Sequence, residues 1–216
     1  MSGYFITGTD TGVGKTHFAV AMINALKARG KTVAGMKPVA AGCEITKYGL
    51  RNDDAIKLQQ ASSIELPYEL VNPYAFEPAI APHIAAQETN VVIDLAHIKN
   101  CYEKIAAKAD VVIVEGAGGW LVPLSETATM ADIALELQLP VILVVGMRLG
   151  CLNHALLTAD SIQAKGAKLA GWVANQIYSD IEKLENNIKS LRQRLQSPLV
   201  ANIPFNKPIE VLHAFE

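Results

Sequence analysis

The chain has few of the residues that mark a disulfide framework, a zinc site or a nucleic-acid clamp. Its three cysteines, Cys43, Cys101 and Cys151, are too few and too scattered for either of the first two. Its formal charge of −2 lacks the basic surplus of a protein that binds many nucleic-acid phosphates. We therefore expect small-molecule partners and no nucleic acid.

Long hydrophobic runs are also missing. No stretch reaches the roughly 18 apolar residues of a membrane span, and the opening MSGYFITGTD has neither the basic start nor the apolar core of a secretion signal. We expect a cytoplasmic protein with no membrane association. A length of 216 residues suits one domain, so residues 1–216 are interpreted as a single globular unit.

Apolar residues are plentiful, at 50% of the chain, and they fall into short β-branched runs that alternate with helical stretches. This alternation predicts an α/β fold with a mostly parallel central sheet covered by helices on both faces. Expected strands are 4–7, 32–36, 111–114, 141–145, 169–174 and 199–203, and expected helices are 15–29, 98–109, 130–137, 152–165 and 181–195. Four prolines within residues 66–90 predict a structured loop there.

A glycine-rich segment, GTDTGVGKT from Gly8 to Thr16, joins the first expected strand to the first expected helix. The backbone N–H groups of such a turn bind phosphate oxygens, and its lysine reaches the outer phosphates. Lys15 has that place here, and Thr16 would place its hydroxyl on Mg²⁺. The segment predicts a P-loop NTPase-like three-layer sandwich that binds ATP or GTP with Mg²⁺.

The loop departs from the standard pattern in two ways. Five residues rather than four separate Gly8 from Gly14, and Thr9 takes the place of the usual first glycine. Switching ATPases of the partition type carry a second lysine five positions ahead of the loop lysine, where this chain has Asp10. This residue counts against an ATPase switch.

Polar residues directly after expected strands are the next candidates, because ligands of doubly wound sheets bind beyond the carboxyl ends of the strands. Lys37 follows the second strand, and Pro38 keeps the chain extended there. The alternative to a binding role for Lys37 is a solvated lysine at a strand end. Glu115 closes the run 111–114. A buried carboxylate needs a partner, either Mg²⁺ or a structural salt bridge, and we favour the metal.

Two adjacent aspartates, Asp53 and Asp54, precede a short helical pattern. One of them can cap the helix while the other faces the metal. Spacing alone does not choose between them.

These segments resemble those of the dethiobiotin synthetase family, in the same order along nearly the whole chain. The matches are GTDTGVGKT (8–16), KPV (37–39), DDA (53–55), EGAGGW (115–120), GCLNH (150–154), LLT (156–158), WVAN (172–175) and IP (203–204). The resemblance implies an ATP-dependent ring closure. In it, 7,8-diaminopelargonic acid takes up CO₂ as a carbamate, the carbamate is phosphorylated, and dethiobiotin, ADP and phosphate leave.

The resemblance also implies the residues of the site. Nucleotide contacts would come from Gly12, Val13, Gly14, Lys15, Thr16, His17, Asp54, Glu115, Gly118, Asn175 and Pro204, with Thr16, Asp54 and Glu115 on Mg²⁺. Diamine contacts would come from Thr11, Lys37, Ala41, Gly118 and Asn153. Lys15 and Lys37 are the expected catalytic residues, because a carbamate and a triphosphate repel unless cations lie between them. No covalent protein nucleophile is needed.

In the family the substrate lies at a two-fold interface, which implies a homodimer in which Asn153 meets the far carboxylate of the partner's substrate. A helix N-cap is the alternative role for Asn153. Two positions depart from the family: Ala41 lacks the hydroxyl that many members use for the substrate, and Gly12 stands where some relatives carry glutamate. In those relatives the residue at position 12 acts through its backbone, and glycine can provide the same backbone contact.

Two other functions are compatible with a phosphate loop. One is a regulatory ATPase whose nucleotide state controls assembly with a partner protein. The other is an amide-forming synthetase for a larger corrin-like substrate, but such enzymes usually add a glutamine amidotransferase domain, for which 216 residues leave no length.

Overall fold

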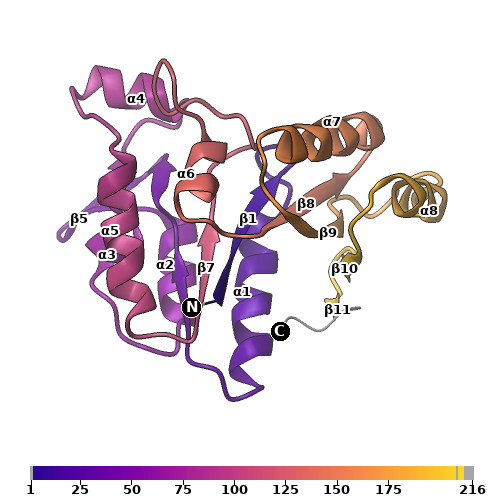
Figure 1. The fold of residues 1–216 in the computed structure, drawn as a ribbon, viewed down its shortest axis with the longest axis horizontal. Helices are drawn as coiled ribbons and strands as arrows, with labels where there is room; N and C mark the ends of the chain where they lie inside the picture. Colours follow the sequence, from indigo (N-terminus) through magenta and orange to yellow (C-terminus); the bar gives the residue numbers. More distant parts are fainter. Residues whose placement is uncertain (1, 208, 212–216) are drawn as a thin grey trace.

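A central sheet divides the protein into three layers (Figure 1). The computed structural model describes residues 2–207 and 209–211, and in this part of the chain the sheet has seven strands in the order β11-β10-β9-β8-β1-β7-β2. Neighbouring strands are parallel, apart from β11, which runs antiparallel to β10. The strands are β1 (Ser2–Gly8), β2 (Val33–Met36), β7 (Val111–Glu115), β8 (Val141–Met147), β9 (Leu169–Gln176), β10 (Leu199–Ile203) and β11 (Glu210–Val211). The predicted α/β class and the mostly parallel sheet are confirmed.

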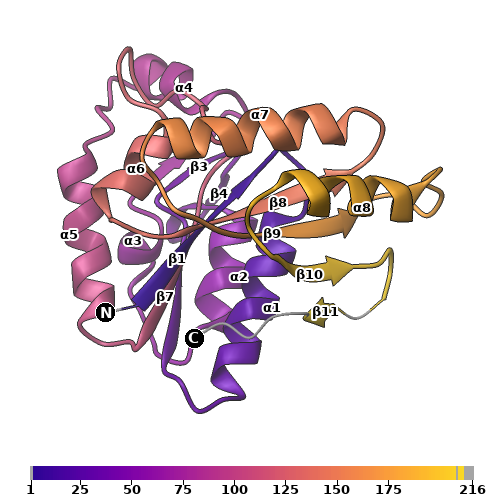
Figure 2. The same ribbon diagram turned by 45° about the vertical axis from the view of Figure 1, so that its right-hand side comes forward.

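Helices cover both faces of the sheet, because successive side chains of a strand point to opposite sides. On one face Ile6 packs with the helices α1 (Lys15–Lys27) and α2 (Asp53–Ala61). On the other face Phe5 belongs to a core with α5 (Leu95–Ala106) and α6 (Met130–Glu136). Figure 2 shows α7 (Cys151–Ala164) and α8 (Leu184–Arg194) beside β8 and β9, where they close a third core.

Local sequence explains why these elements form. In α1 the buried side chains Phe18, Met22 and Leu26 recur every four residues and make one apolar stripe. At the start of α6, Thr129 and Asp132 form a reciprocal capping box. Strands β7 and β8 are buried throughout, as expected of parallel strands covered on both faces. None of the described helices is long and apolar enough to span a membrane.

The segment 66–90 contains short elements that the loop prediction missed: α3 (Tyr68–Val71), β6 (Tyr74–Phe76) and α4 (Pro82–Glu88). The prolines do exclude a long element, and Pro82 opens α4 at a position that needs no backbone donor. Strand β6 pairs with β3 (Val39–Ala41), and β4 (Glu44–Thr46) and β5 (Gly49–Arg51) form a hairpin that was also not predicted. The expected helix 181–195 starts only at Leu184.

Strand register brings three predicted segments to one edge of the sheet. Ile6 of β1 is level with Glu115 of β7, and Met36 of β2 is level with Val114 of the same strand. Lys37, one residue after Met36, therefore comes level with Glu115. The glycine-rich loop begins beside them after Gly8.

Candidate active site

The glycine-rich loop turns directly into α1, whose N-cap is Gly14. Gly12 and Gly14 have positive φ angles of 73° and 89°, a conformation that side-chain-bearing residues rarely adopt. The side-chain amide of Asn175 donates a 2.7 Å hydrogen bond to the carbonyl oxygen of Val13. A Cβ atom on Gly14 would lie 2.1 Å from that amide nitrogen, so position 14 has no room for a side chain.

Lys15 lies along the inside of the loop and is only 6% exposed. Its ammonium donates to the carbonyl oxygen of Asp10 at 3.0 Å, across the space that the loop encloses. Burial, and next the positive charge of Lys37, lower the pKa of Lys15 from 10.5 to about 8. A lysine held this way gains its strongest charge partner when an anion such as phosphate enters the loop.

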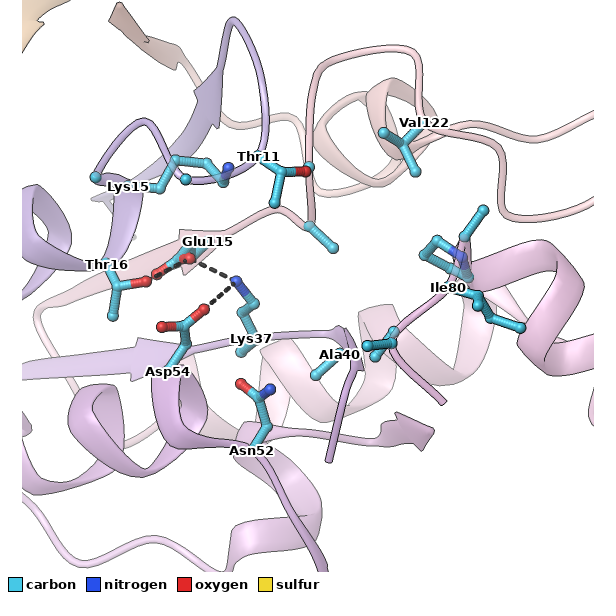
Figure 3. A pocket seen from close by; sticks show the side chains of 18 residues that line it. Thr11, Lys15, Thr16, Lys37, Ala40, Asn52, Asp54, Ile80, Glu115 and Val122 are labelled. Atoms are coloured by element: carbon cyan, nitrogen blue, oxygen red, sulfur yellow. Dashed lines mark hydrogen bonds and ion pairs between the residues drawn. The ribbon is translucent and has the colours of Figure 1, made fainter. Parts of the chain in front are cut away.

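The other charges form one buried cluster, in which the side chains of Thr16, Lys37, Asp54 and Glu115 point toward one another (Figure 3). The ammonium of Lys37 lies 2.5 Å from Oε1 of Glu115 and 3.3 Å from Oδ2 of Asp54. The hydroxyl of Thr16 donates to the same Glu115 oxygen at 2.9 Å. Lys37 is 4% exposed, so the alternative of a solvated lysine at a strand end is wrong.

Opposite charges set the ionisation of this cluster. Burial disfavours the ammonium of Lys37, but the attraction of Glu115 and Asp54 outweighs burial and raises the pKa of Lys37. For Asp54 burial acts against the carboxylate, yet the charge of Lys37 and its hydrogen bond hold the pKa of Asp54 below the ordinary value. The cluster thus keeps an ammonium between two carboxyl side chains.

The helix cap next to this cluster is Asn52, whose side-chain oxygen accepts from the backbone N–H of Ala55 at 3.2 Å. The prediction that one of the two aspartates caps α2 is therefore wrong. Asp53 is exposed and pairs with Lys57 one turn along the helix. Asp54 is the aspartate that faces the site, through its contact with Lys37.

The oxygen donors of the cluster suit a magnesium ion bound together with phosphates. The second carboxylate oxygen of Glu115, Oε2, is buried and has no hydrogen-bond partner among the described residues. No group of three or more His, Cys, Asp or Glu side chains arranged for a metal occurs in that part of the chain. Two carboxylates and a hydroxyl match Mg²⁺, which usually takes one or two carboxylates and completes its shell with phosphate oxygens and water.

A cavity of about 690 Å³ joins the glycine-rich loop to the charged cluster. Ten predicted site residues line it: Thr11, Gly12, Gly14, Lys15, Thr16, Lys37, Ala41, Asp54, Glu115 and Gly118. The opposite wall is formed by residues 79–82 and by Val122, which sequence reasoning missed. Figure 3 shows Ile80 and Val122 across the cavity from the charged cluster. One end of the cavity is therefore ionic and the other mainly apolar.

The remaining predicted residues lie outside this cavity. Val13 is buried beneath the loop, and its carbonyl binds Asn175. His17 is exposed and lines a separate hollow beside α1 and α2. Asn175 is level with Ile203 in the pairing of β9 with β10, which places Pro204 next to it at the same edge. These two residues lie beside the loop, where a base could extend from bound phosphates.

Asn153 lies on the exposed surface of α7. The N-cap of that helix is Gly150, and no side chain caps it, so the alternative of an N-cap role for Asn153 is wrong. Within one chain, Asn153 does not line the cavity.

Solved structures support the fold assignment. The chain is similar to the MinC:MinD cell division protein complex of Aquifex aeolicus, with a TM-score of 0.61, 18% identity, and coverage of 96% of this chain and 83% of that one. It is also similar to the signal recognition particle receptor FtsY of Elizabethkingia anophelis in complex with GDP, with a TM-score of 0.57 and 16% identity. The matched region covers 98% of this chain and 60% of the FtsY chain. These likenesses show the P-loop NTPase fold.

Sequence comparisons identify the family. A family model described as an AAA domain matches residues 2–211. The ATP-dependent dethiobiotin synthetase BioD of Xanthomonas oryzae pv. oryzae is 49% identical over 207 residues, which cover 96% of this chain and 92% of the relative. The proteins of the same name from Xanthomonas axonopodis pv. citri and Pseudomonas paraeruginosa are 50% and 49% identical, each over 94% of this chain and 90% of the relative. The chain therefore belongs to the ATP-dependent dethiobiotin synthetase family.

Proposed function

We propose that this protein makes dethiobiotin from 7,8-diaminopelargonic acid, CO₂ and ATP, releasing ADP and phosphate, as a ligase of biotin biosynthesis. One observation carries the proposal: a single cavity presents a phosphate-binding loop at one side and the buried ammonium of Lys37 at another. Relatives at 49–50% identity carry the name of this synthetase.

The chemistry can proceed without a protein nucleophile. One amine of the substrate adds to CO₂ and loses a proton, which gives a carbamate. A carbamate oxygen attacks the γ-phosphorus of ATP and ADP leaves. The second amine then attacks the carbonyl carbon, closes the cyclic urea and expels phosphate. Phosphoryl transfer of this kind depends chiefly on alignment and charge stabilisation, which fits a site of positioned cations.

In the proposal each of the two lysines stabilises a different anion. Lys15 and the N–H groups at the start of α1 hold the triphosphate. Lys37 holds the carbamate and its mixed anhydride with phosphate, because its ammonium lies at the edge of the same cavity and carries a raised pKa. Thr11 and the Gly118 backbone hold the diamine, and Ala41 borders it without a hydroxyl.

We assign the magnesium site to Thr16, Asp54 and Glu115, on the strength of the orphaned Glu115 oxygen and the oxygen donors around it. When bound, Mg²⁺ would supply positive charge to the phosphates. We assign the adenine pocket to Asn175 and Pro204. The side-chain N–H of Asn175 donates to the carbonyl oxygen of Val13, and its side-chain oxygen can accept a hydrogen bond from the base.

A homodimer is part of the proposal. Leu149 is fully exposed, and Leu121 and Leu157 are 50% and 60% exposed. Leu121 and Leu157 border one hollow together with Thr11 of the phosphate loop. Exposed apolar residues gathered in this way mark interfaces, and Leu157 lies on the helix that carries Asn153. The proposal places the enzyme in the cytoplasm, where ATP is supplied.

A regulatory ATPase is the main rival, because MinD has the same fold. Asp10 stands where the switching ATPases have their second lysine, and its carboxylate forms an ion pair with Arg148 at 2.5 Å. The backbone N–H of Thr11 and this arginine hold the pKa of Asp10 below its ordinary value. An anchored carboxylate cannot supply the positive charge that such a switch places near a nucleotide.

A product assay tests the function. The enzyme is incubated with 7,8-diaminopelargonate, bicarbonate and Mg²⁺, together with ATP, GTP or CTP, and dethiobiotin and nucleoside diphosphate are quantified. We expect one diphosphate per dethiobiotin, and loss of both products when diamine, bicarbonate or Mg²⁺ is withheld. Hydrolysis that proceeds at the same rate without the diamine would contradict the proposal and favour the regulatory ATPase.

A further inference from the structure

Lys37 is held by a segment outside the main sheet. The residue follows β2, and its backbone N–H donates to the carbonyl oxygen of Val71 at 2.8 Å. Its own carbonyl oxygen accepts from the side-chain amide of Asn72 at 2.7 Å. The same amide also donates to the carbonyl oxygen of Tyr74 at 3.2 Å. Asn72 therefore fastens the backbone of Lys37 to the end of α3.

A second set of bonds links this anchor to the helix that carries Asp54. The hydroxyl of Tyr68 donates to the side-chain oxygen of Asn72 at 3.0 Å. It also accepts from the backbone N–H of Asn52 at 2.7 Å. Asn52 is the N-cap of α2, two residues before Asp54. A continuous path of hydrogen bonds thus runs from the Lys37 carbonyl through Asn72 and Tyr68 to the start of α2.

Both side chains on this path, Tyr68 and Asn72, are buried, so their hydrogen bonds face little competition from water. The ring of Tyr68 is held from one side by the guanidinium of Arg51, 4.1 Å from the ring centre. Burial raises the pKa of Tyr68, which keeps its hydroxyl protonated as the donor that Asn72 requires. A buried donor or acceptor left without a partner would destabilise the fold, so these hydrogen bonds hold the side chains in one arrangement.

The network aligns Lys37 with Asp54, a pair that the sheet does not align because Asp54 lies on α2. Glu115 is set by β7, whereas Lys37 comes from beyond β2 and Asp54 from α2. The reacting groups of an enzyme must be placed accurately, because a misplacement of about 1 Å can lower the rate about 100-fold. We propose that Tyr68 and Asn72 are positioning residues that set Lys37 relative to Asp54. This inference rests on the proposed function, in which Lys37 handles the carbamate.

A pair of tyrosine variants tests the proposal. Tyr68→Phe removes the hydroxyl and keeps the ring. Tyr74→Phe is a matched control, because its hydroxyl also accepts a backbone N–H bond, from Asp94 at 2.9 Å, yet Asp94 is the N-cap of α5 and that bond is not part of the path from Lys37 to α2. We expect Tyr68→Phe to lower kcat at saturating substrate by about 10- to 100-fold and Tyr74→Phe to leave it unchanged. Binding of ADP without metal, which depends on the glycine-rich loop, should be unchanged in both.

A second variant examines the Lys37 end of the path. Asn72→Asp keeps an oxygen for the Tyr68 hydroxyl but cannot donate to the Lys37 carbonyl, so the same loss in kcat is expected. Thermal unfolding of all variants reports on stability separately. The proposal is overturned if Tyr68→Phe and Asn72→Asp both keep kcat within about twofold of the parent, or if metal-free ADP affinity falls as much as kcat. Failure of the proposed function differs, since the parent enzyme would then make no dethiobiotin.

Discussion

The ammonium nitrogen of Lys37 lies 2.5 Å from Oε1 of Glu115, between residues that are 78 positions apart in the chain. Both side chains are almost entirely buried. Their meeting follows from strand order, because β2 and β7 are neighbours and their carboxyl ends are level. A charge pair of this kind is expensive to break, since removing one partner leaves the other buried and alone.

Replacing Lys37 with alanine should abolish dethiobiotin formation and leave ADP binding largely intact, because the carbamate loses its cation while the glycine-rich loop is untouched. The unpaired Glu115 should also lower the free energy of unfolding by about 3–5 kcal/mol. Single-turnover assays, ADP titration and urea unfolding measure the three effects. Lys57→Ala is the control, since Lys57 pairs with Asp53 on the surface. Lost ADP affinity in Lys37→Ala would reassign Lys37 to the nucleotide.

The sequence predicts the phosphate loop well because its signal is local. The glycines, Lys15 and Thr16 are contiguous, and their place between a strand and a helix specifies their geometry. Lys37 and Glu115 could be predicted to share the sheet edge, but their contact depends on which strands are neighbours. Sequence patterns do not show that order.

Two features escaped prediction for different physical reasons. Residues Asn52, Asp53 and Asp54 can all cap a helix, and only the backbone angles and contacts show that Asn52 does so. The apolar wall at residues 79–82 depends on how the segment 66–90 folds back over the sheet. Its short elements carry little periodicity of their own, and the four prolines obscure what there is.

Binding of ADP should weaken at high pH because Lys15 loses its charge. The pKa of Lys15 is lowered to about 8, so in the free protein the ammonium form that binds phosphate prevails below about pH 8 and declines above it. Without metal, ADP affinity should fall by roughly tenfold per pH unit above that point. In Lys15→Arg the guanidinium stays charged, so the dependence should disappear even if affinity is lower. An unchanged pH profile in that variant would contradict the assignment.

Leu149→Glu should convert the proposed homodimer to monomers, because it places a carboxylate at a fully exposed leucine two residues before α7, the helix that carries Leu157 and Asn153. Val92→Glu is the matched control: Val92 is also an exposed aliphatic residue, at 82%, but it lies between α4 and α5. Analytical ultracentrifugation should show dimers for the parent and the control. The diamine KM should rise in Leu149→Glu, since Asn153 of each subunit would no longer reach its partner's substrate. A monomeric parent enzyme would contradict the dimer.

Two glycine variants separate backbone strain from collision in the phosphate loop. Gly12→Ala meets nothing within 4 Å, so it should cost only the positive-φ penalty of about 1–2 kcal/mol. Gly14→Ala has the same penalty and in addition a contact of 2.1 Å with the Asn175 amide, which must turn away from Val13 and lose its hydrogen bond. That loss should add about 1–3 kcal/mol and weaken ADP binding further.

A double-mutant cycle identifies the cause of this difference. If the collision with the amide is responsible, Asn175→Ala should remove most of the extra cost of Gly14→Ala, so that the effects of the two changes on the free energy of unfolding are not additive. Gly12→Ala combined with Asn175→Ala should be additive, because position 12 has open space around it. Urea unfolding measures both cycles. Additivity in the Gly14 cycle would show that backbone conformation alone requires glycine at position 14.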